Sequence, residues 1–149
     1  MGALVRIRAG EVELSFDVDG AQLVPTELGW DERPTVVLLG PSALYRDRLG
    51  RALARVAQVV YLDGGVDVDD LAGFLDALEI ERPVLLGAAV AVDFASRHRG
   101  RAAKVVLVGR QDAEAIGCPV LAFSGAEELR AATDDIVAFV LERELEPEP

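Results

Sequence analysis

The strongest candidate for chemistry in this chain is the stretch from Pro83 to Gly100, which predicts a buried strand, a tight turn and a helix. In many hydrolytic enzymes such a unit carries a nucleophilic serine in a Gly-x-Ser-x-Gly turn, which exposes the hydroxyl above the sheet. Here the turn at 87–91 reads Gly-Ala-Ala-Val-Ala, so alanine stands at both the serine and the second glycine position. The pattern indicates a nucleophile turn that has no nucleophile.

Two residues could supply a catalytic base or a replacement nucleophile, His98 and Ser42. His98 is the only histidine of the chain, and it lies where the helix after the turn should end. A cation is favourable at that end of a helix, so we interpret His98 as a helix-end residue rather than a base. Ser42 follows an apolar run and precedes a helical pattern, which favours an N-cap. The alternative for Ser42 is anion binding at the helix N-terminus or a relocated nucleophile.

Other polar residues give weaker signals. Cys118 lies in an apolar context with no base in view to lower its pKa, so we interpret it as structural. Glu127 and Glu128 open a short predicted helix, where carboxylates stabilise the N-terminus without a catalytic role.

Metal and phosphate sites are not indicated. The acidic cluster that could suggest a metal loop lacks the EF-hand spacing and its late glutamate, so we expect a solvated helix cap at Asp67, Asp69 and Asp70. The glycines at Gly40 and Gly64-Gly65 are too short a pattern for a loop that cradles phosphate. The sequence predicts no metal and no cofactor.

Composition limits the class of protein. The chain has 149 residues and a hydrophobic fraction of 51%, which predicts one globular domain over 1–149 with an acidic, frayed tail at 142–149. A net charge of −11 argues against nucleic-acid binding, which needs clustered Lys and Arg. One cysteine, no signal-peptide pattern and no membrane-length apolar run lead us to expect a cytoplasmic protein that does not bind membranes.

The elements that must position these residues begin with strands. Leu4 to Arg8 and Val12 to Asp17 alternate apolar and polar residues, which predicts an antiparallel hairpin at a sheet edge. Val24 to Pro34 contains two prolines and a glycine and is interpreted as a loop, with Trp30 packed on the body of the protein. Continuous apolar runs predict strands buried on both faces at 35–39, 59–62, 84–86, 105–108 and 120–123.

Helical patterns separate most of these runs. The apolar spacing predicts a helix after Ser42 that contains Leu49 and Leu53, and a second helix capped by Asp67. The last helix is expected to use Thr133 as its N-cap and to bury Ile136, Val137, Val140 and Leu141. Alternation of strands and helices predicts a doubly wound, mostly parallel α/β sheet with the N-terminal antiparallel hairpin at one edge.

The order of these segments resembles the α/β-hydrolase fold family, and within it the branch of proline-iminopeptidase-like enzymes and related esterases. The resemblance covers Leu14 to Leu141 and is carried by an ordered set of motifs: Arg33–Gly40, Leu44–Arg46, Val56–Asp63, Asp70–Pro83, Ala95–His98, Gly100–Val108 and Cys118–Leu121. It implies a minimal α/β-hydrolase-like domain with no lid.

The segments that carry chemistry in that family are shortened or missing here. The family's His-Gly-Gly loop is replaced by Gly40-Pro41-Ser42, and about ten residues replace the helical lid before Pro119. The family's acid would fall near Glu127 or Glu128, but its C-terminal histidine and final strand have no counterpart. We name the remaining positions the vestigial active-site region: Gly40, Ser42, Asp63, Gly87, Ala88 and Ala89.

These departures favour a catalytically inactive, minimised relative that binds a partner protein or a small ligand. Loss of the final strand predicts an exposed pairing edge, so we expect a homodimer or a protein partner. The alternative is an acyl transferase or other thioester-handling enzyme of a biosynthetic pathway, acting on an acyl ligand or carrier protein mainly by positioning. A third interpretation is an engineered or trimmed chain with no native role.

Overall fold

The computed structural model describes eleven parts of the chain, and all structural statements below concern these residues: 5–9, 12–20, 23–27, 29–39, 46–62, 67–87, 89–98, 100–108, 118–123, 128 and 131–141. The expected tail at 142–149 lies outside them.

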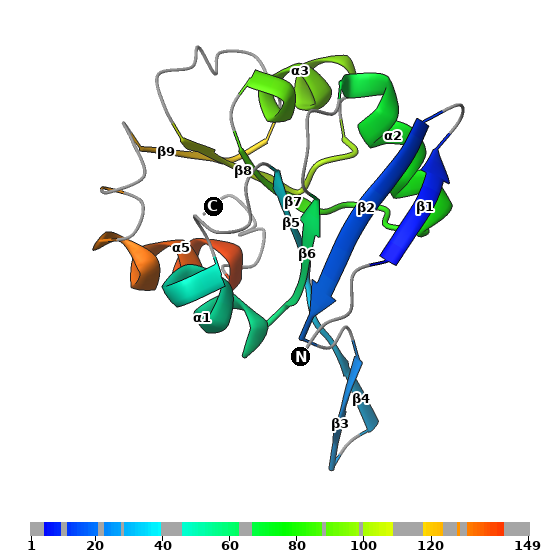
Figure 1. The fold of residues 1–149 in the computed structure, drawn as a ribbon. Coiled ribbons are helices and arrows are strands. Elements are labelled where there is room, and N and C mark those ends of the chain that lie inside the picture. Colours follow the sequence, from blue (N-terminus) through cyan, green and yellow to red (C-terminus); the bar gives the residue numbers. More distant parts are fainter. Residues whose placement is uncertain are drawn as a thin grey trace.

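The described strands form a seven-stranded sheet in the order β1-β2-β6-β5-β7-β8-β9 (Figure 1). Antiparallel pairing joins β1 to β2 and β2 to β6, whereas the strands from β6 to β9 run parallel. The predicted edge hairpin and the five predicted apolar strands are therefore confirmed. Their bounds are Val5–Ala9 for β1, Val12–Asp19 for β2, Thr35–Leu39 for β5, Gln58–Leu62 for β6, Val84–Gly87 for β7, Lys104–Val108 for β8 and Val120–Phe123 for β9.

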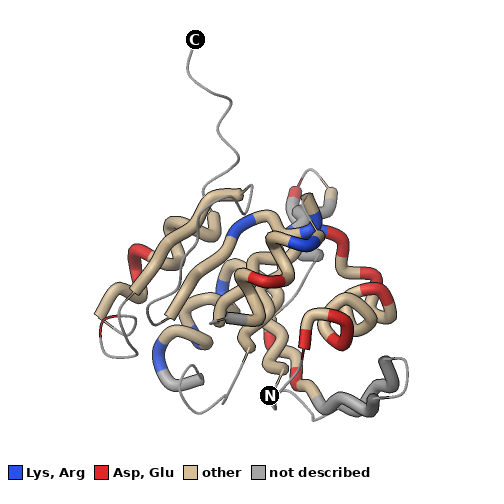
Figure 2. Tube along the Cα trace, turned by 90° about the horizontal axis from the view of Figure 1, so that it is seen from above, with Lys and Arg blue, Asp and Glu red and all other residues tan. Residues whose placement is uncertain are grey.

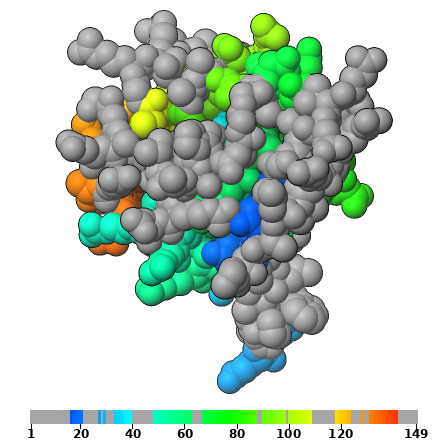
Figure 3. Space-filling view, viewed as in Figure 1, coloured from blue at the N-terminus to red at the C-terminus, as the bar shows by residue number. Residues whose placement is uncertain are grey.

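The segment interpreted as a loop contains a second, two-stranded sheet, so that prediction is wrong. β3 (Leu23–Thr26) pairs antiparallel with β4 (Gly29–Glu32), with Pro25 opposite Trp30. This hairpin projects from the main body (Figure 1), and the light-blue atoms at its outer end lie at the bottom of Figure 3. Proline is tolerated because each strand of a two-stranded sheet has an edge that needs no N–H donor. The side chain of Trp30 lies outside the described atoms, so its expected packing stays a prediction.

Helices cover both faces of the sheet. α2 (Val68–Ala77) and α3 (Ala89–Arg97) lie on one face, whereas the short α1 (Arg51–Ala54) and α5 (Thr133–Leu141) lie on the other (Figure 1). A π-helical turn, η2 (Arg46–Gly50), leads directly into α1. Figure 2 shows that acidic and basic positions are both spread along the described part of the chain. None of the helices in the described part of the chain has the length and apolarity needed to cross a bilayer.

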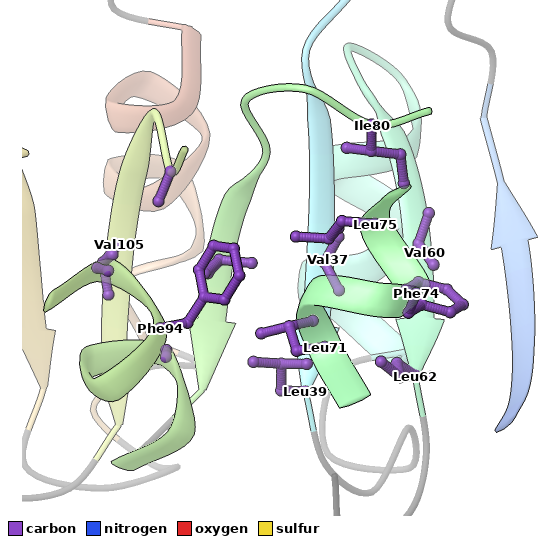
Figure 4. Packing of buried hydrophobic residues seen from close by; sticks show 14 of the residues in the cluster. Val37, Leu39, Val60, Leu62, Leu71, Phe74, Leu75, Ile80, Phe94 and Val105 are labelled. Atoms are coloured by element: carbon purple, nitrogen blue, oxygen red, sulfur yellow. The ribbon is translucent and has the colours of Figure 1, made fainter. Parts of the chain in front are cut away.

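Alternate residues of the central strands face the two helical layers. On β5, Val37 and Leu39 pack in the cluster under α2 and α3 (Figure 4), whereas Val36 and Leu38 pack under α1 and α5. All four side chains are buried. This two-sided burial explains why the strand sequence is continuously apolar rather than alternating.

The start of α2 follows from local sequence, as predicted. The carboxylate of the N-cap Asp67 accepts a hydrogen bond from the Asp70 N–H at 2.8 Å, and the Asp70 side chain accepts one from the Asp67 N–H. Such a capping box satisfies backbone donors that have no partner inside the helix. The helix then buries Leu71, Phe74 and Leu75 against the sheet.

Details of the last helix differ from the expectation. The N–H of Ala132 donates to the Glu128 carbonyl and that of Ile136 to the Ala132 carbonyl, so helical hydrogen bonding precedes Thr133. Thr133 is therefore a buried helical residue rather than the N-cap. Leu141, expected on the buried side, is 45% exposed.

Candidate functional site

The described strands that precede the vestigial active-site region in the sequence have their carboxyl ends at the same end of the sheet. Leu39 pairs with Leu62 across β5 and β6, and Gly87 pairs with Leu107 across β7 and β8. The segments that continue toward Gly40, Asp63 and Ala88 therefore leave from neighbouring strand ends. Carboxyl ends of parallel strands are where α/β proteins bind ligands. Gly40, Ser42, Asp63 and Ala88 themselves lie outside the described residues.

Gly87 has a packing reason to be glycine. A Cβ built on it would lie 3.0 Å from Cβ of Leu39, which is closer than ordinary van der Waals contact. Gly87 ends β7, and α3 begins at Ala89, so one residue separates the strand from the helix. Ala89 therefore occupies the first helical turn. Among the described non-glycine residues the only positive φ belongs to Glu79, so Ala89 does not have the strained backbone of a nucleophile turn.

His98 lies at the opposite end of α3 from Ala89. At 1.5 Å rise per residue the two positions are about 13 Å apart along the helix axis. The imidazole of His98 stacks on the ring of Phe94, with centroids 4.8 Å apart, and the His98 N–H donates to the Phe94 carbonyl. A catalytic base must lie within about 3 Å of the hydroxyl that it deprotonates. The fold therefore keeps the one histidine of this chain away from the turn.

The surroundings of the other candidate residues do not favour a catalytic or metal-binding role. Burial raises the pKa of the Cys118 thiol, and the nearby Arg82 guanidinium opposes this shift only in part. The thiolate that a nucleophile needs is thus disfavoured. Asp67 and Asp70 form the capping box of α2, and Asp69 is exposed in its first turn. Glu128 is exposed, and Glu127 lies outside the described residues. Among described residues no group of His, Cys, Asp and Glu could hold a metal ion.

The sequence did not predict one cavity in the described part of the chain. A cavity of about 280 Å³ lies at the amino ends of β5 and β7 and is lined by 33–35 and 79–82. The signal that could have found it is an Arg-Pro pair directly before each strand, Arg33-Pro34 and Arg82-Pro83. The segments that precede two adjacent parallel strands lie together at the amino end of those strands.

Comparisons with known proteins identify the fold. No family model matches the sequence, and no curated protein matches it. Solved structures do match: E-2-(acetamidomethylene)succinate hydrolase has a TM-score of 0.59 and 16% identity over 74% of this chain and 46% of its own. A meta-cleavage product hydrolase from Pseudomonas fluorescens has a TM-score of 0.56 and 23% identity over 72% of this chain and 47% of its own. A carboxylesterase from Bacillus subtilis has a TM-score of 0.59 and 14% identity over 72% of this chain and 43% of its own.

These similarities define the class. The chain has the α/β-hydrolase fold, in the minimal, mostly parallel form that the sequence predicted. It spans less than half the length of each of these hydrolases. At such low identity the similarity concerns the fold and not the reaction.

Proposed function

We propose that this chain is a non-hydrolytic member of the α/β-hydrolase fold that acts by binding a protein partner. The observation that carries the proposal is the position of His98, stacked on Phe94 at the end of α3 that is remote from Ala89. In this fold hydrolysis needs a serine on the turn and a histidine in hydrogen-bond reach of it. The residues of this chain supply neither at the turn between β7 and α3.

Binding is supported by the edge of the sheet at β9. No described strand pairs with β9 on the side away from β8. Its four residues, Val120-Leu-Ala-Phe123, contain no charge and no proline, the features that normally protect an edge from pairing. Ala122 is exposed, and Val120 and Leu121 are half-buried. Ile136 and Val140 of α5 are buried in the same core cluster as Phe123 of β9.

The partner that this edge fits best is a second copy of the chain. Two β9 strands related by a two-fold axis would pair antiparallel and extend the sheet across the dimer, and such two-fold dimers are the commonest oligomers. Uncharged strands can approach each other without placing like charges face to face.

Sedimentation velocity at high micromolar concentration tests the dimer. We expect the parent chain to dimerise and Ala122→Lys to weaken the dimer, because two lysines would meet across the axis. Ala77→Lys is the matched control, since Ala77 is an exposed alanine at the end of α2, away from β9. A parent chain that stays monomeric, or dimers weakened equally by both substitutions, would contradict pairing through β9.

A substrate assay tests the absence of hydrolysis. We expect no turnover of p-nitrophenyl acetate or of an N-acetylcysteamine thioester above the buffer rate, and no change in His98→Ala. Turnover that co-purifies with the chain and is lost in His98→Ala would overturn the proposal. Acyl transfer from the thioester without ester hydrolysis would instead favour the thioester-handling alternative.

A further inference from the structure

The cavity lies at the amino ends of β5 and β7, at the opposite end of the sheet from the carboxyl ends of these strands. In Figure 4 Ile80, one of its lining residues, lies at one end of the strands, and Leu39 and Leu62 lie at the other. The cavity is therefore separate from the edge at which this fold places its chemistry. Nothing in the proposed function uses it.

Two arginines line this cavity because each lies in the segment just before one of two neighbouring strands. Arg33-Pro34 precedes β5 and Arg82-Pro83 precedes β7. The two strands are parallel neighbours, with Val36 opposite Val84. The two arginines therefore lie at the same end of the sheet, next to the amino ends of both strands. The fixed φ of each proline restricts the backbone that carries the arginine before it.

Arg33 is held in place by the protein. Its Nη1 donates a hydrogen bond to the carbonyl oxygen of Arg55 at 2.7 Å, and its side chain is half-buried. A guanidinium has five N–H donors and stays charged at all accessible pH values. Its other N–H groups match the geometry of a carboxylate, which guanidinium groups bind through two parallel hydrogen bonds.

Carboxylates line the same cavity. Glu79 and Glu81 are exposed on the segment between α2 and β7, and Glu79 has a φ of 58°, which fixes the course of the chain there. Within the described part of the chain neither carboxylate has an ion-pair partner. Pro34 and the buried Ile80 add apolar surface between the charged groups. The lining thus combines two arginines, of which Arg33 is held by a hydrogen bond, with two glutamates and an apolar wall.

We propose that this cavity binds a small aliphatic zwitterion of the α-amino-acid type. The ligand's carboxylate pairs with the Arg33 guanidinium, its ammonium group lies toward Glu79 and Glu81, and its aliphatic side chain contacts Pro34 and Ile80. A simple anion would meet the two glutamates, and a simple cation would meet Arg33 and Arg82. The volume of about 280 Å³ is close to the lower limit of small-molecule sites, about 300 Å³, and suits a molecule of this size.

Titration calorimetry with three related probes tests the charge pattern. L-leucine carries both charges, N-acetyl-L-leucine keeps the carboxylate alone, and L-leucinamide keeps the ammonium alone. We expect L-leucine to bind about fivefold more tightly than either derivative, as for one partly exposed ion pair lost. Equal binding of N-acetyl-L-leucine, or no binding of L-leucine at millimolar concentration, would overturn the proposal.

Two substitutions locate the site. Arg33→Gln should weaken L-leucine and N-acetyl-L-leucine alike, whereas Glu81→Gln should weaken L-leucine and leave N-acetyl-L-leucine unchanged or slightly tighter. The matched controls are Arg97→Gln and Asp93→Asn, which remove the same charges from exposed positions of α3. Glu81 is exposed, so its variant tests the site even if Arg33→Gln unfolds. If the control variants weakened binding of these ligands as much, the effect would come from overall charge, and this would contradict the site.

Discussion

Gly87 shows how a residue typical of a catalytic turn can be retained for packing. The contact that a Cβ would make with Leu39 accounts for the glycine without any role in a reaction. Ala89 likewise has an ordinary backbone, because it is already the first residue of α3. Sequence reasoning could predict which residue types are missing from the turn. It also predicted that His98 lies at the far end of the helix, but it could not predict the stacking of its ring on Phe94.

Restoring the serine tests this view of the turn. Ala89→Ser should stay folded, within about 1 kcal/mol of the parent chain. It should not react, because a hydroxyl in the first helical turn bonds to nearby backbone and has no base beside it. Labelling with a fluorophosphonate, with an active serine hydrolase as positive control, measures this. Stoichiometric labelling of the new serine would show an exposed, activated nucleophile and contradict the interpretation.

The Cys118 thiol gives a pH-dependent prediction. Burial raises the pKa of Cys118 above its ordinary value, and Arg82 opposes that shift. The thiolate fraction at neutral pH is thus lower than for a free thiol, so iodoacetamide should react slowly at pH 7 and faster as the pH rises. Arg82→Gln removes the opposing charge, so it should raise the pKa further and slow alkylation at a fixed pH. Arg97→Gln is the control, and an accelerated reaction in Arg82→Gln would contradict the assigned cause.

Elements differ in how well their sequence predicts them. β5 begins and ends where its apolar run does, because a strand covered on both faces has no polar positions to blur the pattern. β9 also matches its apolar run, although Ala122 on it is exposed. The hairpin of β3 and β4 was missed because Pro25 indicates a loop and a two-stranded sheet buries too little to impose alternation. The cavity at 33–35 and 79–82 was missed for another reason, since its halves meet only through strand pairing.

The capping box of α2 gives a prediction for that helix. Asp67→Ala removes the side chain that accepts from the Asp70 N–H and should lower the free energy of unfolding by about 1 kcal/mol. Asp69→Ala is the matched control, because Asp69 is acidic in the same turn but exposed and outside the box. Its cost should be about 0.5 kcal/mol, from the helix dipole alone. Urea unfolding measures both, and an equal or larger loss for Asp69→Ala would contradict the cap.

Gly20, which follows β2, and Gly100 both have a positive φ but differ in how close their neighbours lie. Gly20 has a φ of 78°, and a Cβ there would lie 2.3 Å from the carbonyl oxygen of Ala57. Gly100 has a φ of 86°, and nothing lies within 4 Å of its Cβ position. Gly100→Ala should cost about 1 kcal/mol, from the left-handed backbone alone. Gly20→Ala should cost about 2 kcal/mol more, because backbone must move. Similar midpoints of urea unfolding for the two variants would contradict the close approach.

At the scale of the whole molecule the charge opposes the proposed dimer. Each copy carries a net charge of −11, so two copies repel each other before their edges meet. Raising the ionic strength from about 0.01 M to about 0.1 M shortens the screening length from about 30 Å to about 10 Å. The dimer should therefore be tighter at the higher ionic strength, as measured by sedimentation. A dimer weakened by salt would indicate that ion pairs, rather than uncharged strand edges, hold it together.

The order of strands in the sheet also bears on synthesis of the chain. β2 is made early, but its partner in the centre of the sheet is β6, with Asp19 opposite Val59. About 40 further residues must be translated before β6 exists, which takes about 2–8 s at ordinary elongation rates. During that interval the edge of β2 that later pairs with β6 is unpaired on the nascent chain. Ribosome-bound chains stalled before β6 should therefore be cleaved in β2 by added protease, and chains stalled after β8 should resist.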